Sequence, residues 1–118
     1  MTASKQLNVI EHREPDGTLL ATYGRRWDSR GAWVRHGHYA GYHPNGAVRT
    51  EGEYENGREE GIWRDYHDNG WIACVGEYHL GLEQGLWRFF DREGNEGKTV
   101  LYRDGSAIDL AGSNREPD

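Results

Sequence analysis

The sequence predicts an all-β fold of tandem β-hairpins, which form one elongated, twisted antiparallel meander sheet of about eight strands. A period of 24 residues is the first observation, because Gly37, Gly61 and Gly85 begin three similar segments. Turn signals recur at the same place in each segment, as in His43-Pro44-Asn45-Gly46 and His67-Asp68-Asn69-Gly70. The frequent glycines also disfavour helix, since each costs about 1 kcal/mol in a helix interior.

The repeats divide the chain into a single domain, residues 1–110. A divergent N-terminal hairpin covers 5–27 and contains the turn Glu14-Pro15-Asp16-Gly17. An insertion covers 28–36. Three repeats follow, 37–60, 61–84 and 85–105, and the stretch 111–118 is predicted to be a disordered tail.

Aromatic columns at the repeat period predict how the strands pair. Tyr39, Trp63 and Trp87 share one column, and Tyr54, Tyr78 and Tyr102 share another. The turns allow either a two-residue register or a three-residue type I register with a left-handed glycine. The two-residue register places Trp63 opposite Gly76 and Tyr39 opposite Gly52, and we favour it because a large ring covering a strand glycine fixes register.

Composition and charge narrow the class of protein. Residues 37–105 contain 7 Lys and Arg against 13 Asp and Glu, a net charge of 7 − 13 = −6 that argues against a nucleic-acid or anionic membrane partner. By contrast, residues 24–36 are locally basic, either as an ordinary solvated strand or as a site for an acidic partner. A single cysteine, Cys74, excludes an intramolecular disulfide, and with no signal peptide or membrane span we expect a cytoplasmic protein.

Nothing in the sequence predicts an active site or a cofactor, so we expect no enzyme. His43, His67 and Asp91 share a repeat column, but their position beside turns predicts hydrogen bonds to the backbone rather than a metal site. Cys74 is expected to fill space within a strand. Glu77 is expected to form a cross-strand ion pair with Arg64 or Arg88.

The pattern G-x-W-x-x-Y-x-x-N-G, then G-x-Y-x-x-G, resembles the variant MORN repeat of bacterial proteins. Here it is formed by Gly61, Trp63, Tyr66, Asn69 and Gly70, then Gly76, Tyr78 and Gly81. Bacterial proteins built of this repeat are often assigned to a YwqK-like antitoxin family. The resemblance implies a repeat protein that binds and neutralises a toxin, and it transfers no catalytic residue.

Three functions therefore remain open. The first is a non-enzymatic antitoxin or immunity protein that binds a toxin encoded nearby. The second is an aromatic cage for choline or a glycan. The third is a MORN-type scaffold or lipid-associated protein.

For the first function we predict a partner-binding surface. It combines aromatic and basic residues that the repeat pattern does not require with charged residues that recur at the repeat period. Trp71 breaks its column and directly follows a turn, so it is either an exposed anchor or a cover for a neighbouring glycine. The predicted partner-binding residues are Trp33, Arg35, Arg64, Trp71, Glu53, Glu77 and Arg88. A homodimer through an unpaired edge strand is a further expectation.

Overall fold

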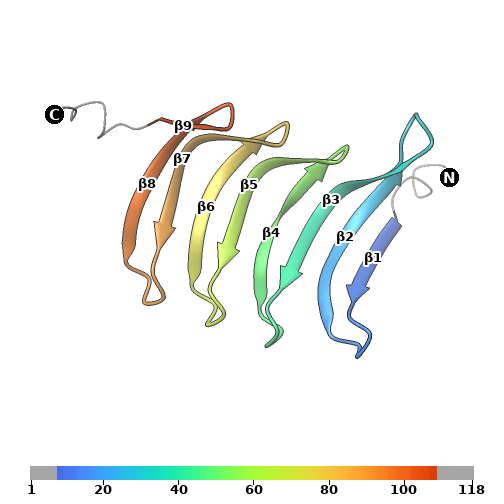
Figure 1. Ribbon diagram of the computed structural model, residues 1–118, viewed down its shortest axis with the longest axis horizontal. Helices are drawn as coiled ribbons and strands as arrows, with labels where there is room; N and C mark the ends of the chain where they lie inside the picture. Colours follow the sequence, from blue (N-terminus) through green and yellow to red (C-terminus); the bar gives the residue numbers. More distant parts are fainter. Residues whose placement is uncertain (1–7, 109–118) are drawn as a thin grey trace.

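The computed structural model describes residues 8–108, which form one antiparallel sheet without a helix (Figure 1). The strands follow the chain order, so every strand pairs with its sequence neighbours. They are β1 (Asn8–Arg13), β2 (Leu19–Trp27), β3 (Trp33–Tyr42), β4 (Val48–Glu55), β5 (Arg58–Tyr66), β6 (Ile72–His79), β7 (Leu82–Phe90), β8 (Glu96–Arg103) and β9 (Ser106–Ile108). The predicted meander is confirmed, with the short β9 as a ninth strand. The expected tail at 111–118 lies outside the described residues.

The turns at the lower edge of the sheet in Figure 1, here called the lower turns, are type I turns closed by a glycine. In the β3–β4 turn the amide of Gly46 donates to His43 O (2.9 Å), and the amide of His43 donates to Ala47 O (2.8 Å). Gly46 has a φ of 92°, whereas Asn45 is not left-handed. The three-residue turn is therefore the one present, and our preference for the two-residue turn is wrong.

The predicted strand pairing is nevertheless confirmed, because a bulge restores it. Tyr42 pairs with Val48 next to the turn, but Gly41 pairs with Thr50, which leaves Arg49 as an extra residue. Beyond this bulge Tyr39 lies opposite Gly52. The same bulge in the β5–β6 hairpin places Trp63 opposite Gly76.

The upper turns of β4–β5, β6–β7 and β8–β9 are the two-residue type. Their first residues, Asn56, Leu80 and Asp104, and the glycines that follow them all have positive φ, which defines a type I′ turn. Each turn also bonds to an earlier strand: the amide of Gly57 donates to Arg35 O (2.7 Å) and that of Gly81 to Glu59 O (3.0 Å). The segments that join one repeat hairpin to the next therefore form hairpins as well.

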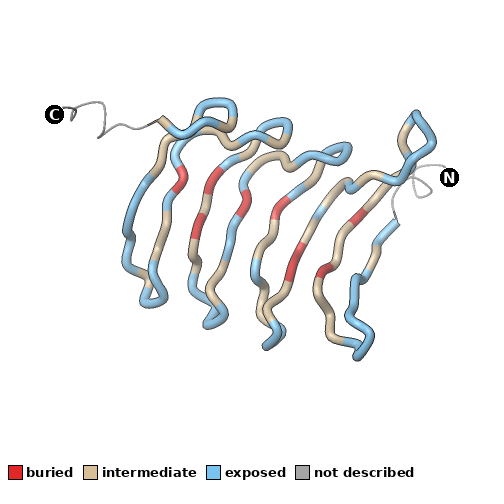
Figure 2. Tube along the Cα trace, in the orientation of Figure 1, coloured by how far each residue is buried: buried red, intermediate tan, exposed pale blue. Residues whose placement is uncertain are grey.

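A continuous row of rings on one side of the sheet, here called the aromatic face, contains the two largest of the five buried hydrophobic side chains in residues 8–108, Trp63 and Trp87. The row consists of Tyr23, Tyr39, Tyr54, Trp63, Tyr78, Trp87 and Tyr102, with successive ring centroids 5.0–6.2 Å apart. Trp63 and Trp87 are 7% and 8% exposed. Buried positions lie in the middle of the strands, and the turns are exposed (Figure 2).

Each of the two buried tryptophans covers a glycine. The covered glycine lies on the preceding strand, whereas the glycine that is the cross-strand partner of Trp63 lies on the following strand. Trp63 lies over Gly52 of the preceding strand, and Trp87 lies over Gly76. The indole N–H of Trp63 donates to Glu53 O (3.1 Å), and that of Trp87 donates to Glu77 O (3.3 Å). Each tryptophan is thus fixed by the backbone of the strand before its own.

Candidate functional site

The β2–β3 hairpin departs most from the repeat, and its turn projects as a larger loop from the upper edge of the sheet (Figure 1). Residues 28–36, expected as an insertion, form its turn and the beginning of β3. The Asp28 carboxylate accepts hydrogen bonds from the amides of Arg30 (2.9 Å) and Ala32 (2.9 Å). The Ala32 bond is the main cause that lowers the pKa of Asp28. Asp28 thus serves the turn, and the nearby charges of Arg30 and Arg26 lower its pKa further, although neither arginine forms an ion pair with it.

Two tryptophans flank this turn and remain accessible. Trp27 and Trp33 are cross-strand partners, and their rings meet edge to face at 5.2 Å. Trp27 is 52% exposed and Trp33 is 43% exposed. Because the strand register and the ring contact both fix them, these side chains present a rigid apolar surface to solvent.

Two arginines lie below the tryptophans as a directly opposed pair, Arg25 on β2 and Arg35 on β3. The Arg25 guanidinium stacks 4.1 Å from the ring centroid of Trp33. The Arg35 guanidinium lies among three rings, 5.0 Å from Tyr23 and 5.5 Å from Tyr39 and from Tyr54. Guanidinium groups favour such stacked positions because they are planar and weakly hydrated.

Within residues 8–108, none of the four arginines of this region, Arg25, Arg26, Arg30 and Arg35, forms an ion pair with a carboxylate. Arg25 donates instead to the Asn8 amide oxygen (3.3 Å), and Arg26 donates to that of Asn56 (2.6 Å). No ion pair within residues 8–108 therefore compensates the positive charge of this region.

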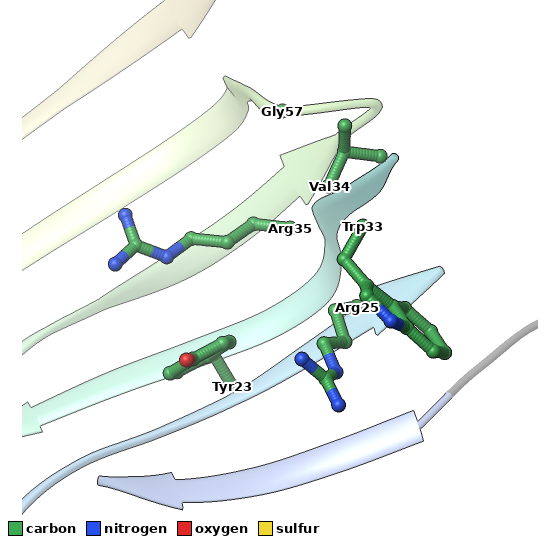
Figure 3. A pocket seen from close by; sticks show the side chains of 6 residues that line it. All are labelled: Tyr23, Arg25, Trp33, Val34, Arg35 and Gly57. Atoms are coloured by element: carbon green, nitrogen blue, oxygen red, sulfur yellow. The ribbon is translucent and has the colours of Figure 1, made fainter. Parts of the chain in front are cut away.

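An open depression of about 430 Å³ lies at this hairpin (Figure 3). Its lining residues are Tyr23, Arg25, Trp33, Val34, Arg35 and Gly57. The floor is aromatic and aliphatic, and guanidinium groups come from both strands. We call this depression, together with Trp27, the basic–aromatic end.

The structure brings together only two of the predicted partner-binding residues, Trp33 and Arg35, and both belong to the basic–aromatic end. Arg64, Arg88, Glu53 and Glu77 each adjoin a residue of the aromatic row, so they project from the opposite face of the sheet. Trp71 directly follows the β5–β6 lower turn. The seven residues therefore do not form one site.

Trp71 combines both roles considered for it. Its ring lies over Gly94 of the next lower turn, where an added Cβ would be 3.2 Å from ring carbons. It is still 55% exposed. Trp71 thus covers a glycine with one face and leaves the rest of the ring accessible.

The expected ion pair of Glu77 with Arg64 or Arg88 is wrong for the residues that the structure describes. The register places Glu77 opposite Ile62 and Gln84. Arg88 instead forms two hydrogen bonds with Glu96, at 2.9 and 3.0 Å.

The lower-turn histidines connect neighbouring hairpins. His43 Nε2 lies 2.7 Å from Tyr66 O, and His67 Nε2 lies 2.9 Å from Phe90 O. Since a carbonyl only accepts, each histidine donates from Nε2. Among residues 8–108 no group of His, Cys, Asp and Glu side chains is arranged to hold a metal ion.

Cys74 is 7% exposed, and burial raises the pKa of its thiol to about 11. A thiol at that pKa is protonated near neutral pH and does not act as a nucleophile. No helix long and apolar enough to cross a membrane occurs in residues 8–108.

Two hairpins of this sheet are similar to a known repeat. Residues 35–56 and 59–79 each match the family model described as MORN repeat variant. These segments span β3–β4 and β5–β6. The MORN repeat indicates a repeat scaffold or interaction module. No curated protein and no solved structure matches the chain.

Sequence reasoning placed Arg25 and Trp27 in the basic stretch 24–36, a possible site for an acidic partner, but it did not name Tyr23, Arg25 or Trp27 as partner-binding residues. A signal for them was present, because Arg25 and Trp27 precede Asp28–Ala32 at the same distances at which Trp33 and Arg35 follow it. This symmetry marks a hairpin, and recognising the hairpin would have paired the two tryptophans and the two arginines.

Proposed function

We propose that the protein is a non-enzymatic protein-binding module, and more specifically a cytoplasmic antitoxin that binds and neutralises a toxin encoded by a neighbouring gene. The observation that carries this proposal is the set of exposed but fixed tryptophans, Trp27, Trp33 and Trp71. Rigid exposed aromatic side chains dominate the energetics of protein interfaces, where Trp, Tyr and Arg are enriched. They lose little conformational entropy on binding because their positions are already set.

The charge of the sheet supports a protein partner over a nucleic acid. Residues 37–105 carry a net charge of −6, which repels phosphate backbones and attracts a basic protein. A toxin that acts on nucleic acid needs a basic surface of its own, so it would complement this charge. Such complementarity increases the association rate and makes it sensitive to salt.

A ligand cage for choline is less well supported. The cluster of Tyr23, Tyr39 and Tyr54 resembles a cage for a cation, but the guanidinium of Arg35 occupies it. An external quaternary ammonium would have to displace that group.

The test is co-expression of the protein with the product of each adjacent gene, followed by affinity purification and a binding titration at low and high salt. We expect one neighbour to co-purify, to bind more weakly at high salt and to lose its toxicity in the cell. Trp71→Ala and Trp33→Ala should each be compared with the unmodified protein. Absence of binding to every neighbouring product at every salt concentration would overturn the proposal.

A further inference from the structure

We infer that the basic–aromatic end is a binding site for an acidic segment of a partner protein, with the carboxylates held by Arg25 and Arg35 and an apolar side chain packed against Trp27 and Trp33. This inference rests on the proposed function as a protein-binding module and assigns its partner chemistry at one defined place. It concerns a surface separate from the acidic body of the sheet.

The first argument is the pairing of like charges. Arg25 and Arg35 are direct cross-strand partners, and like charges directly opposite each other destabilise a sheet. No carboxylate within residues 8–108 forms an ion pair with either guanidinium. A carboxylate bound to either guanidinium would reduce the repulsion, so the free protein already favours an anionic ligand here.

The second argument is the orientation of the guanidinium groups. Arg25 stacks on Trp33 at 4.1 Å, and Arg35 lies over Tyr23 at 5.0 Å (Figure 3). Stacking uses the flat face of a guanidinium and leaves N–H donors on its edge for an acceptor. The fork of donors matches the two oxygens of a carboxylate, and a preordered fork loses less entropy on binding.

The third argument is the shape and polarity of the surface. The depression has a volume of about 430 Å³, enough for a few side chains but not for a folded domain. Its aromatic floor continues into the exposed rings of Trp27 (52%) and Trp33 (43%). A segment that alternates acidic and apolar residues fits both parts of this surface.

The same charges argue against a nucleic acid as the ligand. Arg25, Arg26, Arg30 and Arg35 form a small positive region beside a body, residues 37–105, with a net charge of −6. A polynucleotide extends its charge over many residues, so its phosphates would meet the acidic body beyond this end. A short acidic segment concentrates its charge where the arginines are.

The test uses a blocked hexapeptide of alternating glutamate and leucine, with a glutamine–leucine peptide as the uncharged control. The ¹⁵N-labelled protein is titrated at about 150 mM salt, and the indole N–H signals of the five tryptophans are followed by NMR. We expect the acidic peptide to shift the signals of Trp27 and Trp33 and to leave those of Trp63 and Trp87 unchanged. The glutamine peptide should shift none of them.

Variants then test whether the arginine charge is responsible for binding of the acidic peptide. Arg25→Gln is expected to weaken the acidic peptide by roughly tenfold, and Arg25→Lys by less, because lysine keeps the charge but not the stacked fork. Arg92→Gln is the matched control, since Arg92 is paired with Asp68 far from this end. It should leave peptide affinity unchanged. The unfolding midpoint of Arg25→Gln should equal or exceed that of the unmodified protein because the opposed charge is gone. If Arg25→Gln does not fold, Arg35→Gln replaces it.

Three outcomes would overturn the inference: equal binding of the glutamine peptide, unchanged affinity of Arg25→Gln, or tighter binding of single-stranded DNA or phosphatidylserine vesicles than of the acidic peptide. These outcomes are separable from failure of the proposed function. If a toxin co-purifies but the acidic peptide binds no better than the glutamine peptide, the acidic-segment site is refuted while the protein-binding role stays intact.

Discussion

Replacement of Gly76 by alanine tests whether the tryptophan-over-glycine contact holds the sheet together. A Cβ at Gly76 would come closer than 3.0 Å to the Cγ, Cδ2 and Cε2 atoms of Trp87. The ring is flanked by Tyr78 at 5.0 Å and Tyr102 at 5.9 Å, so it cannot move without losing contacts on both sides.

The cost follows from what the displaced ring loses. Two edge-to-face contacts contribute about 0.5–1.5 kcal/mol each. The hydrogen bond from the indole to Glu77 O contributes about 1 kcal/mol. In a strand, alanine itself raises the free energy of unfolding by roughly 0.5–1 kcal/mol relative to glycine. We therefore expect Gly76→Ala to lower the free energy of unfolding by about 2 kcal/mol, in the range found for overpacked cores.

The assay is urea unfolding followed by tryptophan fluorescence. Gly97→Ala is the control, because the nearest atom to its added Cβ is Phe89 O at 3.7 Å, an ordinary contact. Because Gly97 lies in β8, Gly97→Ala should raise the free energy of unfolding by roughly 0.5–1 kcal/mol, which is the gain of alanine over glycine without a clash. If Gly76→Ala is as stable as Gly97→Ala, the ring does not depend on the glycine and the reasoning is wrong.

Three further predictions concern other parts of the chain. Leu80 has a φ of 52° in a type I′ turn and is 54% exposed, so Leu80→Asn should raise the free energy of unfolding by about 1 kcal/mol in urea melts; a lower value would show that the leucine side chain stabilises the turn. The pKa of Asp91 is held below its usual 3.8, first by the Asn95 amide, so its stabilising effect is present above about pH 4 and is lost as the pH falls further. Asp91→Asn keeps an acceptor for both amides and should flatten the decline of the unfolding midpoint below pH 4, and an unchanged acid profile would contradict this. The thiol of Cys74, with a pKa raised to about 11, should react with Ellman's reagent slowly in the native protein at pH 8 and rapidly in urea; equal rates would mean that the β6 strand opens freely.

The sequence predicts the hairpins and their aromatic columns because the same turn and strand residues recur in each repeat. Tyr39 opposite Gly52 and Trp63 opposite Gly76 are confirmed for that reason. The turn type was wrong because an extra bulged residue, Arg49 in the β3–β4 hairpin, compensates for a turn one residue longer. The extra turn residue and the extra bulged residue offset each other in the strand pairing. The pattern of columns is therefore the same for either turn type.

Other features depend on contacts distant in sequence, which local propensity does not reveal. Leucine rarely adopts positive φ, so Leu80 itself does not predict a type I′ turn, although its repeat equivalents Asn56-Gly57 and Asp104-Gly105 do. The turn forms because its amides find acceptors on β5: Leu80 N donates to Glu60 Oε1 (3.0 Å), and Gly81 N donates to Glu59 O (3.0 Å). The pairing of Arg25 with Arg35 was missed for a different reason, because the local symmetry about Asp28–Ala32 that marks the β2–β3 hairpin was interpreted as an insertion.

The hydrogen bonds from the upper turns to earlier strands give assembly of the sheet a direction in time. The Gly57 and Gly81 amides donate to carbonyls of Arg35 and Glu59, which are synthesised more than twenty residues earlier. Chains emerge from the ribosome at roughly 5–20 residues per second, N-terminus first. The carbonyl acceptors are therefore already present when each new hairpin is synthesised. The growing sheet is thus a template for its own next strand.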